Sequence, residues 1–421
     1  MILQISYWIA GTILAVVWFS RILEAAIGMP KIANVARPEW DRQPPTPTGE
    51  PRVSIIVPAR NEEQDIRATL DSLLALDYSN YEVIAVDDRS TDATGQRMDE
   101  VARLWGAGAA APERLLPALQ AGSDGACPEP AEGNVRSTLN VIHIANLPAG
   151  WMGKTHAMWT AGKQATGDWL LFTDADVLFK PDSLRRVVAY AETEGADHVV
   201  LFPRMRMEHA GERMMIAFFQ TMFVFGHRPW KVADPRAQDH MGVGAFNMVR
   251  RPVYYAIGTY QALRMEVLDD MKLGKLIKNA GFAQRNVFGE ALISLHWVKG
   301  TFGIVENLTK NFFALLSFQW PRTVATIFAL AFLNLGPFVG LWLAHGWARL
   351  PYAIALASIF AIYYGMSRLS DVAPYYCLLH PVSTCLVIYT LARSMVLTIS
   401  QGGIVWRGTK YPLDELRRGM V

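Results

Sequence analysis

The chain has 421 residues, of which 51% are hydrophobic and 19% are charged, with a formal net charge of +2 and three cysteines. This composition excludes an intrinsically disordered chain, and three cysteines do not make a disulfide framework. A near-neutral chain without a clustered basic stripe gives no case for nucleic-acid binding. Of the 78 charged residues, 8 lie in residues 1–50 and 11 in residues 321–421, so 59 lie between them. A polar domain is therefore expected between two apolar ends.

The N-terminal segment predicts a membrane anchor. Residues 2–20 carry no charge, and this is about the length of helix that crosses a hydrocarbon core of roughly 30 Å. A cleaved signal peptide, the competing interpretation, would have a basic start and a shorter apolar run. Arg21 and Lys31 follow the run and no basic residue precedes it, which places the N-terminus outside and the next part in the cytosol. We expect a transmembrane helix over 1–22 and a Pro-rich linker over 23–51.

Three further apolar runs come late in the chain, at residues 323–344, 350–367 and 372–392. They predict two or three C-terminal crossings, and hence a multi-pass protein of the inner (cytoplasmic) membrane with a cytosolic catalytic domain. Three crossings would put the basic tail outside, against the positive-inside rule, so we expect one run to be re-entrant or interfacial. The expected order is an interfacial helix over 301–320, transmembrane helices over 321–400 and a basic tail over 401–421.

Between the apolar ends, β-rich runs alternate with helical stretches, which predicts an α/β domain with a mostly parallel sheet. Asn61 and Gln64 have the spacing of a capping box and predict the start of the first helix. Residues 106–133, rich in Ala, Gly and Pro, predict a surface insertion. The expected strands cover residues 53–57, 81–86, 139–144, 169–173 and 198–202.

Acidic residues follow two of these strands. The segment D-D-R-S-T-D occupies residues 87–92, and D-A-D occupies residues 174–176. Open parallel sheets bind ligands beyond the carboxyl ends of their strands, so these residues mark the candidate site. No G-x-G-x-x-G or P-loop motif follows a strand, which argues against a dinucleotide or P-loop fold. Carboxylates in place of glycines favour a bridging divalent cation, Mg²⁺ or Mn²⁺.

Three segments in this order resemble family 2 glycosyltransferases of the GT-A (Rossmann-like) fold: V-P-A-R-N-E at 57–62, D-D-R-S-T-D at 87–92 and D-A-D at 174–176. The resemblance covers about residues 50–315. It implies a nucleotide-sugar-dependent GT-A catalytic domain over 52–300.

Two more segments agree with the resemblance. G-W-M-G-K at 150–154 looks like the family's G-K segment, and L-D-D-M-K-L-G at 268–274 looks like its E-D-x-x-L-G segment. Asp269 stands where glutamate is more usual. That leaves Asp270 at the position of the family's general base.

The resemblance implies a metal-dependent, inverting transfer of a hexose. Asp176 would be the metal ligand and Asp174 its ribose or metal partner, because a divalent cation neutralises the charge of a departing nucleoside diphosphate. Asp270, with Asp269 beside it as a second catalytic candidate, would take the proton of the acceptor hydroxyl. The alternatives are a solvated charge for Lys154 and a surface ion pair between Arg60 and Glu62. The implied donor-binding residues are Pro58, Ala59, Arg60, Glu62, Asp88, Lys154 and Asp174.

The acceptor is predicted from the C-terminal part. Processive polysaccharide synthases of the family carry Q-x-x-R-W after the base, whereas I-S-L-H-W at 293–297 keeps only the Trp. E-N-L-T-K-N-F-F at 306–313 resembles the K-N-x-F stretch of hopanoid- and carotenoid-associated membrane glycosyltransferases, and W-R-G-T-K-Y at 406–411 resembles their terminal motif. Lys310 would stabilise the donor diphosphate, or else snorkel to lipid headgroups. We expect a membrane lipid acceptor of the hopanoid, carotenoid, ceramide-like or polyprenyl kind; a processive polysaccharide synthase and a non-catalytic sugar-nucleotide-binding membrane scaffold are the alternatives.

Two remaining features stay ambiguous between function and packing. Met205, Met207, Met214 and Met215 favour an interfacial amphipathic segment rather than a cofactor site. His240 precedes a glycine-containing run where this family often shapes its acceptor pocket, and a structural histidine is an equal alternative.

Overall fold

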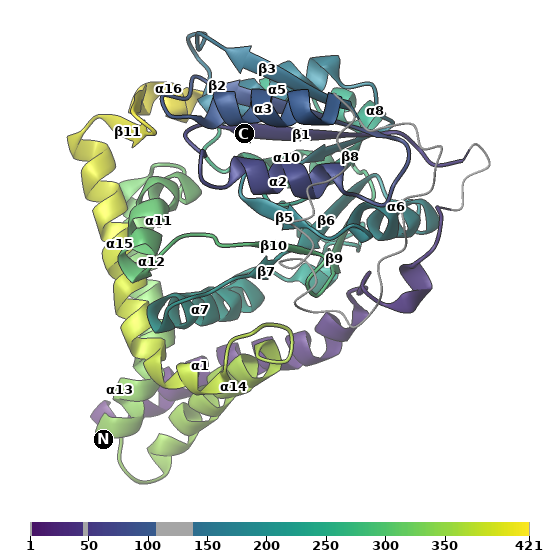
Figure 1. Ribbon diagram of the computed structural model, residues 1–421. Helices are drawn as coiled ribbons and strands as arrows, with labels where there is room; N and C mark the ends of the chain where they lie inside the picture. The colour runs from purple at the N-terminus through teal and green to yellow at the C-terminus, as the bar shows by residue number, and fades with distance from the viewer. Residues whose placement is uncertain (1, 45–48, 107–137, 421) are drawn as a thin grey trace. The chain divides into compact units, whose positions relative to one another are not determined.

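The computed structural model describes residues 2–44, 49–106 and 138–420 (Figure 1). The chain divides into two compact units. Unit 1 comprises Met1–Ile32, Met205–Val232 and His296–Met420, and unit 2 comprises Ala33–Arg204 and Ala233–Leu295. The insertion predicted at residues 106–133 lies, apart from its first residue, outside the described residues.

Unit 2 is built on a seven-stranded sheet with the order β3-β2-β1-β4-β8-β6-β9. Among these described strands β8 runs antiparallel to its neighbours β4 and β6, and the other neighbouring pairs are parallel. The prediction of a mostly parallel α/β sheet is confirmed. The strands are β1 (Val53–Ala59), β2 (Tyr81–Asp88), β3 (Thr138–Ile144), β4 (Trp169–Phe172), β6 (His198–Phe202), β8 (Asn247–Arg250) and β9 (Gln284–Phe288).

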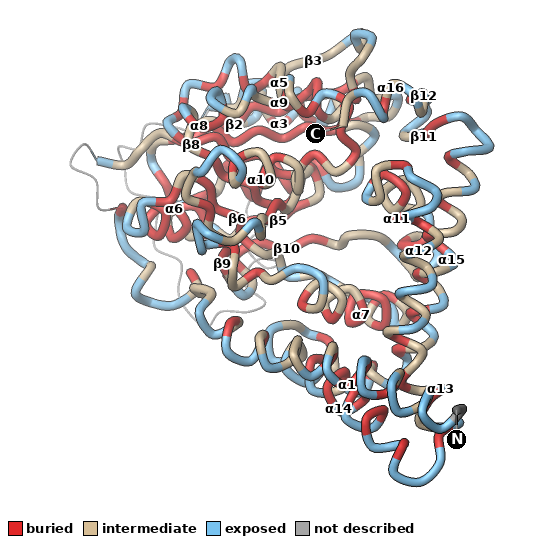
Figure 2. The backbone as a smooth tube through the Cα atoms, turned by 180° about the vertical axis from the view of Figure 1, so that it is seen from behind, coloured by how far each residue is buried: buried red, intermediate tan, exposed pale blue. Residues whose placement is uncertain are grey.

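The inner strands of this sheet are buried on both faces. Every residue of β1 and β4 is buried, because helices cover both sides of this mostly parallel sheet. Figure 2 draws the buried backbone of β1 in red. One core cluster joins Ile56, Leu170 and Phe172 of the sheet to Met158 and Leu273 of two covering helices. The other elements of the unit are η2 (Pro38–Trp40), α2 (Ile66–Leu74), α3 (Thr94–Gly106), α5 (Gly153–Gln164), β5 (Val177–Phe179), α6 (Ser183–Thr193), β7 (Arg204–Met205), α8 (Arg251–Ala256), α9 (Thr259–Ala262), α10 (Asp269–Asn279) and β10 (Ile293–Leu295).

The predicted capping box at Asn61 is wrong. Helix α2 begins at Ile66 after Asp65, which makes no capping hydrogen bond with its side chain. Asn61 instead has a φ of 54°, and its Oδ1 accepts the N–H of Thr91 at 2.8 Å. Asparagine tolerates this left-handed conformation. The side chain therefore ties the end of β1 to the turn after β2, where the candidate site begins.

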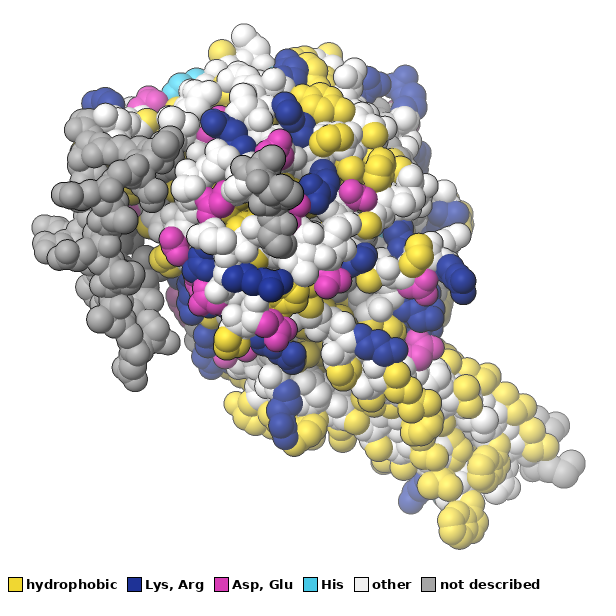
Figure 3. Space-filling view, turned by 90° about the vertical axis from the view of Figure 1, so that its right-hand side faces the viewer, with side chains coloured by type: hydrophobic (Ala, Val, Ile, Leu, Met, Phe, Trp, Pro, Cys, Tyr) yellow, Lys and Arg dark blue, Asp and Glu magenta, His cyan; other side chains and the backbone are white. Residues whose placement is uncertain are grey.

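Among its described residues, unit 1 contains four helices that are long and apolar enough to cross a membrane. Large hydrophobic side chains on them face outward, among them Trp342, 79% exposed, and Phe328, 69% exposed. Figure 3 shows hydrophobic side chains crowded over this part of the surface. Such exposed apolar surface is costly in water and suits a bilayer, so these helices support a membrane location. The four candidate spans are Gln4–Lys31, Trp320–Leu343, Gly346–Met366 and Pro374–Ser400.

The elements of unit 1 differ in extent from the predicted ranges. The first helix runs to Gly28, beyond the predicted end at residue 22. Met205–Val232 packs in unit 1, so the predicted catalytic range 52–300 is interrupted in space. The elements are α1 (Ile2–Gly28), η1 (Met29–Lys31), α7 (Ala210–Gly226), η3 (Pro229–Lys231), α11 (Thr301–Leu315), α12 (Trp320–Leu330), η4 (Ala331–Leu335), α13 (Gly336–Leu343), η5 (Gly346–Arg349), α14 (Leu350–Met366), η6 (Pro374–Leu379), α15 (His380–Ser400), β11 (Gly403–Trp406), β12 (Thr409–Pro412) and α16 (Leu413–Arg418).

The Pro-interrupted run is one continuous apolar helix. A π-helical turn, η4, joins α12 to α13, and the side chain of Asn334 donates to the carbonyl of Leu330 at 2.9 Å. This turn absorbs Pro337 without ending the helix. Arg417 of the tail donates to the carbonyl of Phe318 at 3.0 Å, just before α12 begins. The tail thus lies at the end of unit 1 where α12 starts. The cytosolic side of the tail and the re-entrant run both stay predictions.

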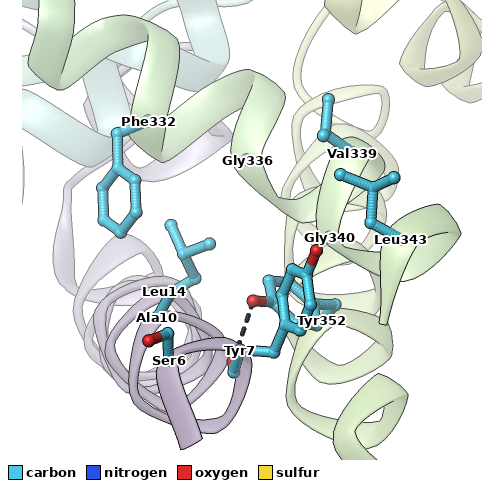
Figure 4. A pocket seen from close by; sticks show the side chains of 10 residues that line it. All are labelled: Ser6, Tyr7, Ala10, Leu14, Phe332, Gly336, Val339, Gly340, Leu343 and Tyr352. Carbon is cyan, nitrogen blue, oxygen red and sulfur yellow. Dashed lines mark hydrogen bonds between the residues drawn. The ribbon is translucent and has the colours of Figure 1, made fainter. Parts of the chain in front are cut away.

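A cavity of about 260 Å³ lies among α1, α13 and α14 (Figure 4). Its lining is almost wholly apolar, with Leu14, Phe332 and Leu343 among the side chains around it. The hydroxyl of Tyr352 donates to the carbonyl of Tyr7 at 2.8 Å, which satisfies the polar end of this ring in an apolar setting.

Glu212 is a buried carboxylate that ties the start of α7 to the start of α11. Its Oε1 accepts the N–H of Gly300 at 2.6 Å, and its Oε2 accepts the N–H of Glu208 at 2.8 Å. Burial alone would raise the pKa of Glu212, but these backbone hydrogen bonds, with contributions from His209, lower it to about 2.

We expect Glu212→Gln to destabilise the protein by about 1–3 kcal/mol at neutral pH, because an amide N–H then opposes a backbone N–H. The pKa lies below its usual value of 4.5, so the stabilisation is present above that pH and is lost as the pH falls toward 2. Thermal unfolding is measured for both detergent-solubilised proteins. The difference in Tm between the wild type and Glu212→Gln should be constant from pH 7 to 6 and should shrink below pH 4.5. The exposed Asp414→Asn serves as control, and a gap that widens in acid would contradict the assignment.

Candidate active site

Lys154, at the start of α5, lies among carboxylates at the carboxyl edge of the sheet. Its Nζ is 2.7 Å from Oδ1 of Asp174, which follows β4, and 3.8 Å from Oδ1 of Asp269 at the start of α10. Burial alone would lower the pKa of Lys154, but Asp174, Asp269 and Asp270 raise it. The side chain is only 20% exposed, so Lys154 is a charged member of the site rather than a solvated surface lysine.

Asp270 is held in one orientation by two backbone donors. Its Oδ2 accepts the N–H of Gly244 at 2.9 Å, and its Oδ1 accepts the N–H of Met271 at 2.7 Å. Each carboxylate oxygen has two lone pairs, so one remains on each for a further partner. Burial raises the pKa of Asp270 despite the opposing effect of Lys154 and of these hydrogen bonds. A fixed carboxylate with a raised pKa has the properties of a general base.

Asp269 differs from its neighbour in environment. Its side chain is almost wholly buried, and its Oδ2 has no hydrogen-bond partner in the part of the chain that the structure describes. Burial raises the pKa of Asp269 to about 7, although Lys154 opposes the rise. The two adjacent aspartates therefore differ. Backbone N–H groups hold the Asp270 carboxylate, whereas Oδ2 of Asp269 has no hydrogen-bond partner among the described residues.

Asp176 has the features of a cation ligand. Its Oδ1 is buried without a hydrogen-bond partner among the described residues. Burial, together with the negative charges of Asp174 and Glu62, raises the pKa of Asp176 to about 7. The described residues contain no group of three or more His, Cys, Asp or Glu that could hold a metal by itself. Two carboxylates that take further oxygen ligands from substrate phosphates are the usual arrangement for Mg²⁺, so Asp174 and Asp176 fit a divalent cation shared with a donor.

Asp88 forms the second half of the site, at the end of β2. It is 3% exposed, and Nε of Arg89 lies 2.8 Å from its Oδ1. Nη1 of Arg60, which follows β1, is 3.9 Å from its Oδ2. Pro58 and Ala59 are buried at the end of β1, next to these charges. The structure thus brings together the residues expected to bind the base and ribose.

Gly153 leaves room for the Asp88 carboxylate. A Cβ at this position would overlap Oδ2 of Asp88 and would approach the guanidinium of Arg89 to 2.9 Å. We expect Gly153→Ala to raise the donor KM at least about tenfold, because a carboxylate displaced by 1 Å no longer meets a bound ribose or base. Gly226→Ala, whose Cβ enters open space among the described atoms, is the control. Steady-state kinetics check both variants, and an unchanged donor KM in Gly153→Ala would remove Asp88 from the donor site.

Lys310 belongs to unit 1, whereas the carboxylates described above belong to unit 2. Its Nζ is 4.4 Å from the centre of the Trp406 ring, so the K-N-x-F stretch and the terminal W-R-G-T-K-Y motif meet in a cation–π contact. Its role toward a diphosphate stays a prediction. His240 makes a local contact, with Nδ1 3.1 Å from the carbonyl oxygen of Gln238.

Sequence reasoning missed the buried polar side chains beneath the site. His198, Asn247 and Gln284 lie on β6, β8 and β9 and share hydrogen bonds. They belong to no motif and occur in short β-rich runs, so no pattern in the sequence singles them out.

The sheet topology and the acidic carboxyl edge define a glycosyltransferase domain of the GT-A type. The model of glycosyl transferase family 2 matches residues 54–108 and 121–271, and the domain that these residues form belongs to this family. The resemblance stated from the motifs is confirmed.

Relatives of known name extend over almost the whole chain. A 4,4'-diaponeurosporenoate glycosyltransferase of Staphylococcus aureus (strain N315) is 21% identical over 408 residues, covering 94% of this chain and 99% of the relative. The protein of the same name from strain USA300 is 20% identical with the same coverage. A mannosyltransferase of Pyrobaculum calidifontis, solved in complex with GDP-Man and Mn²⁺, has a TM-score of 0.51 at 20% identity, covering 94% of this chain and 99% of that one. At this identity the structural likeness establishes the fold.

Proposed function

We propose that this protein is a membrane-bound, inverting glycosyltransferase that moves one sugar from a nucleotide-sugar to a lipid acceptor. The observation that carries the proposal is the carboxylate group around Lys154 at the carboxyl edge of the sheet, in a chain with four membrane-length apolar helices. A named lipid-type glycosyltransferase similar over 94% of the chain supports the acceptor class.

The donor would lie across the ends of β1, β2 and β4. Asp88 would bind ribose or base, with Arg60, Pro58 and Ala59 beside it and Glu62 close to Asp176. A divalent cation held by Asp176 and Asp174 would neutralise the negative charge that develops on the diphosphate. Lys154 would add a fixed positive charge near the leaving group, without reorganisation in the transition state.

Asp270 would accept the proton of the acceptor hydroxyl as this oxygen attacks the anomeric carbon. The bond to the diphosphate breaks in the same displacement, and the electron pair leaves with the nucleoside diphosphate. Attack from the face opposite the leaving group inverts the configuration. Asp269, buried beside Lys154, would keep that ammonium in place.

The acceptor would enter from the bilayer. Four apolar helices in unit 1 and the aromatic side chains exposed on them suit a substrate dissolved in lipid. A basic tail beside the start of α12 suits a catalytic domain on the cytosolic side, where nucleotide-sugars are available.

The direct test incubates membranes that contain the protein with radiolabelled UDP-glucose, UDP-N-acetylglucosamine and GDP-mannose. We expect one labelled, lipid-soluble product with a single sugar by mass spectrometry. A water-insoluble polymer would instead indicate a processive synthase. The absence of any labelled product from correctly folded protein would contradict the proposal.

A further inference from the structure

Three buried polar side chains form a hydrogen-bonded group under the start of α10. His198 lies on β6, between Asn247 on β8 and Gln284 on β9, and each is at most 1% exposed. His198 is opposite Gln284 in the parallel β6–β9 register. None of the three belongs to the chemistry described above. Buried polar groups cost stability unless they are paired. The presence of three buried polar side chains bonded to one another at this place therefore needs an explanation.

The hydrogen bonds fix one tautomer of His198. Nε2 lies 2.5 Å from Oδ1 of Asn247, an acceptor, so Nε2 carries the proton and donates. Nδ1 lies 2.8 Å from the amide nitrogen of Gln284, a donor, so Nδ1 accepts. Burial lowers the pKa of His198 to about 4, although the hydrogen bond that its Nε2 donates to Asn247 opposes this change, and the ring is neutral at physiological pH.

Further hydrogen bonds of the Asn247 and Gln284 amides connect His198 to the candidate active site. Oε1 of Gln284 accepts the N–H of Met241 at 2.8 Å, and its Nε2 also donates to the carbonyl of Gly274 in α10 at 3.1 Å. Nδ2 of Asn247 donates to the backbone carbonyl of Asp270 at 3.5 Å. Gln284 thereby uses both its donors and its acceptor, and the network ends on the loop before β8 and on α10.

The loop and the helix are in direct backbone contact. A Cβ at Gly242 would overlap the carbonyl of Asp270, and a Cβ at Gly274 would overlap the carbonyl of Met241. The same loop supplies the Gly244 N–H that holds Oδ2 of Asp270. The amides of Asn247 and Gln284 therefore set the spacing on which the orientation of the Asp270 carboxylate depends.

We propose that His198 is a positioning residue: through Asn247 and Gln284 it holds the loop before β8 against α10 and so aims the Asp270 carboxylate at the acceptor hydroxyl. This inference rests on the proposed function of Asp270 as the base. His198 touches no reactant; it acts on the distance between the Asp270 carboxylate and the acceptor hydroxyl. A misplacement of about 1 Å at a reacting centre costs about 100-fold in rate.

The test compares three variants of the full-length protein in detergent with lipid extract as acceptor source. His198→Leu removes both ring contacts, and His198→Gln keeps a nitrogen that can donate to Asn247. Asn247→Asp keeps the acceptor for His198 but puts an oxygen against the Asp270 carbonyl. Tyr81→Phe, which removes a buried hydrogen bond to Leu73 in the same unit, is the matched control.

With the sugar nucleotide that the wild type uses among UDP-glucose, UDP-N-acetylglucosamine and GDP-mannose, we expect kcat to fall at least 30-fold in His198→Leu and Asn247→Asp. The donor KM of these variants should stay within threefold of the wild-type value. The kcat of His198→Gln should be at least tenfold higher than that of His198→Leu. Tyr81→Phe should keep both constants within twofold. Wild-type kcat in His198→Leu, or a donor KM that rises in step with the loss of kcat, would overturn the proposal.

Hydrogen–deuterium exchange separates this inference from the proposed function. We expect residues 239–247 and 268–276 to exchange faster in His198→Leu than in the wild type, with no change in Tyr81→Phe. If the wild type transfers no sugar, the proposed function fails, and the exchange result still decides whether His198 holds the loop and helix together. Unchanged exchange in both segments would overturn the positioning role whatever the transfer assay gives.

Discussion

Replacing Asp270 by asparagine should lower the transfer rate 100- to 10,000-fold while leaving donor binding nearly unchanged, because a positioned carboxylate base contributes about that factor. The N–H groups of Gly244 and Met271 fix the position of the carboxylate, so the substitution removes the proton-accepting group from one defined position. Asp270 makes none of the contacts assigned above to the donor's base or ribose. The KM for the donor should therefore stay within a fewfold of the wild-type value.

The measurement is steady-state transfer to lipid acceptor together with equilibrium binding of the nucleotide-sugar. Asp77→Asn is the control, since Asp77 is 67% exposed in its side chain and pairs with Arg185 away from the carboxyl edge. Near-native turnover in Asp270→Asn would assign the base elsewhere, and Asp269→Asn would then be the next variant to examine. Asp269 is the second candidate because its Oδ2 is unpaired among the described residues.

Asp176→Asn should abolish most metal-dependent activity, with a loss of about 1,000-fold, which corresponds to about 4 kcal/mol of transition-state stabilisation. Oδ1 of Asp176 is buried without a hydrogen-bond partner among the described residues, and the negative charges of Asp174 and Glu62 make an uncompensated carboxylate unfavourable there, so a bound cation would stabilise it. An amide removes the charge that binds the metal without changing the shape of the side chain.

Transfer is measured after removal of metal with EDTA, during titration with Mn²⁺ or Mg²⁺. The wild type should recover its activity at a lower metal concentration than the variant, and Asp77→Asn should follow the wild type. Full activity of the wild type in excess EDTA would show that Asp176 serves another purpose.

The sequence by itself predicted where the candidate site lies. Asp88 ends β2, and Asp174 and Asp176 come shortly after β4. The carboxyl ends of parallel strands meet at one edge of a sheet, so these residues were expected at the same edge. The apolar ends were equally predictable, because a long uncharged segment has few stable environments other than a bilayer. These conclusions depend only on local periodicity and on the order of elements along the chain.

Other parts of the fold depended on contacts between distant segments. The capping-box spacing at Asn61 was misleading because its side chain bonds to Thr91, thirty residues away. The grouping of Met205–Val232 with unit 1 reflects how buried methionines of α7 pack there, which periodicity alone does not specify.

The sequence determined that this chain carries a family 2 glycosyltransferase domain with an acidic sheet edge and apolar helices of membrane-spanning length. The tertiary structure decided how the environments of the acidic residues differ. Asp269 and Asp270 are neighbours in a motif, but successive helical residues point about 100° apart. One is therefore buried beside Lys154 while the other faces the Gly244 N–H. In the loop that supplies this N–H, Met241 donates to Gln284 of β9, whose side chain also contacts His198 of β6, and such a long-range arrangement leaves no local pattern in the sequence.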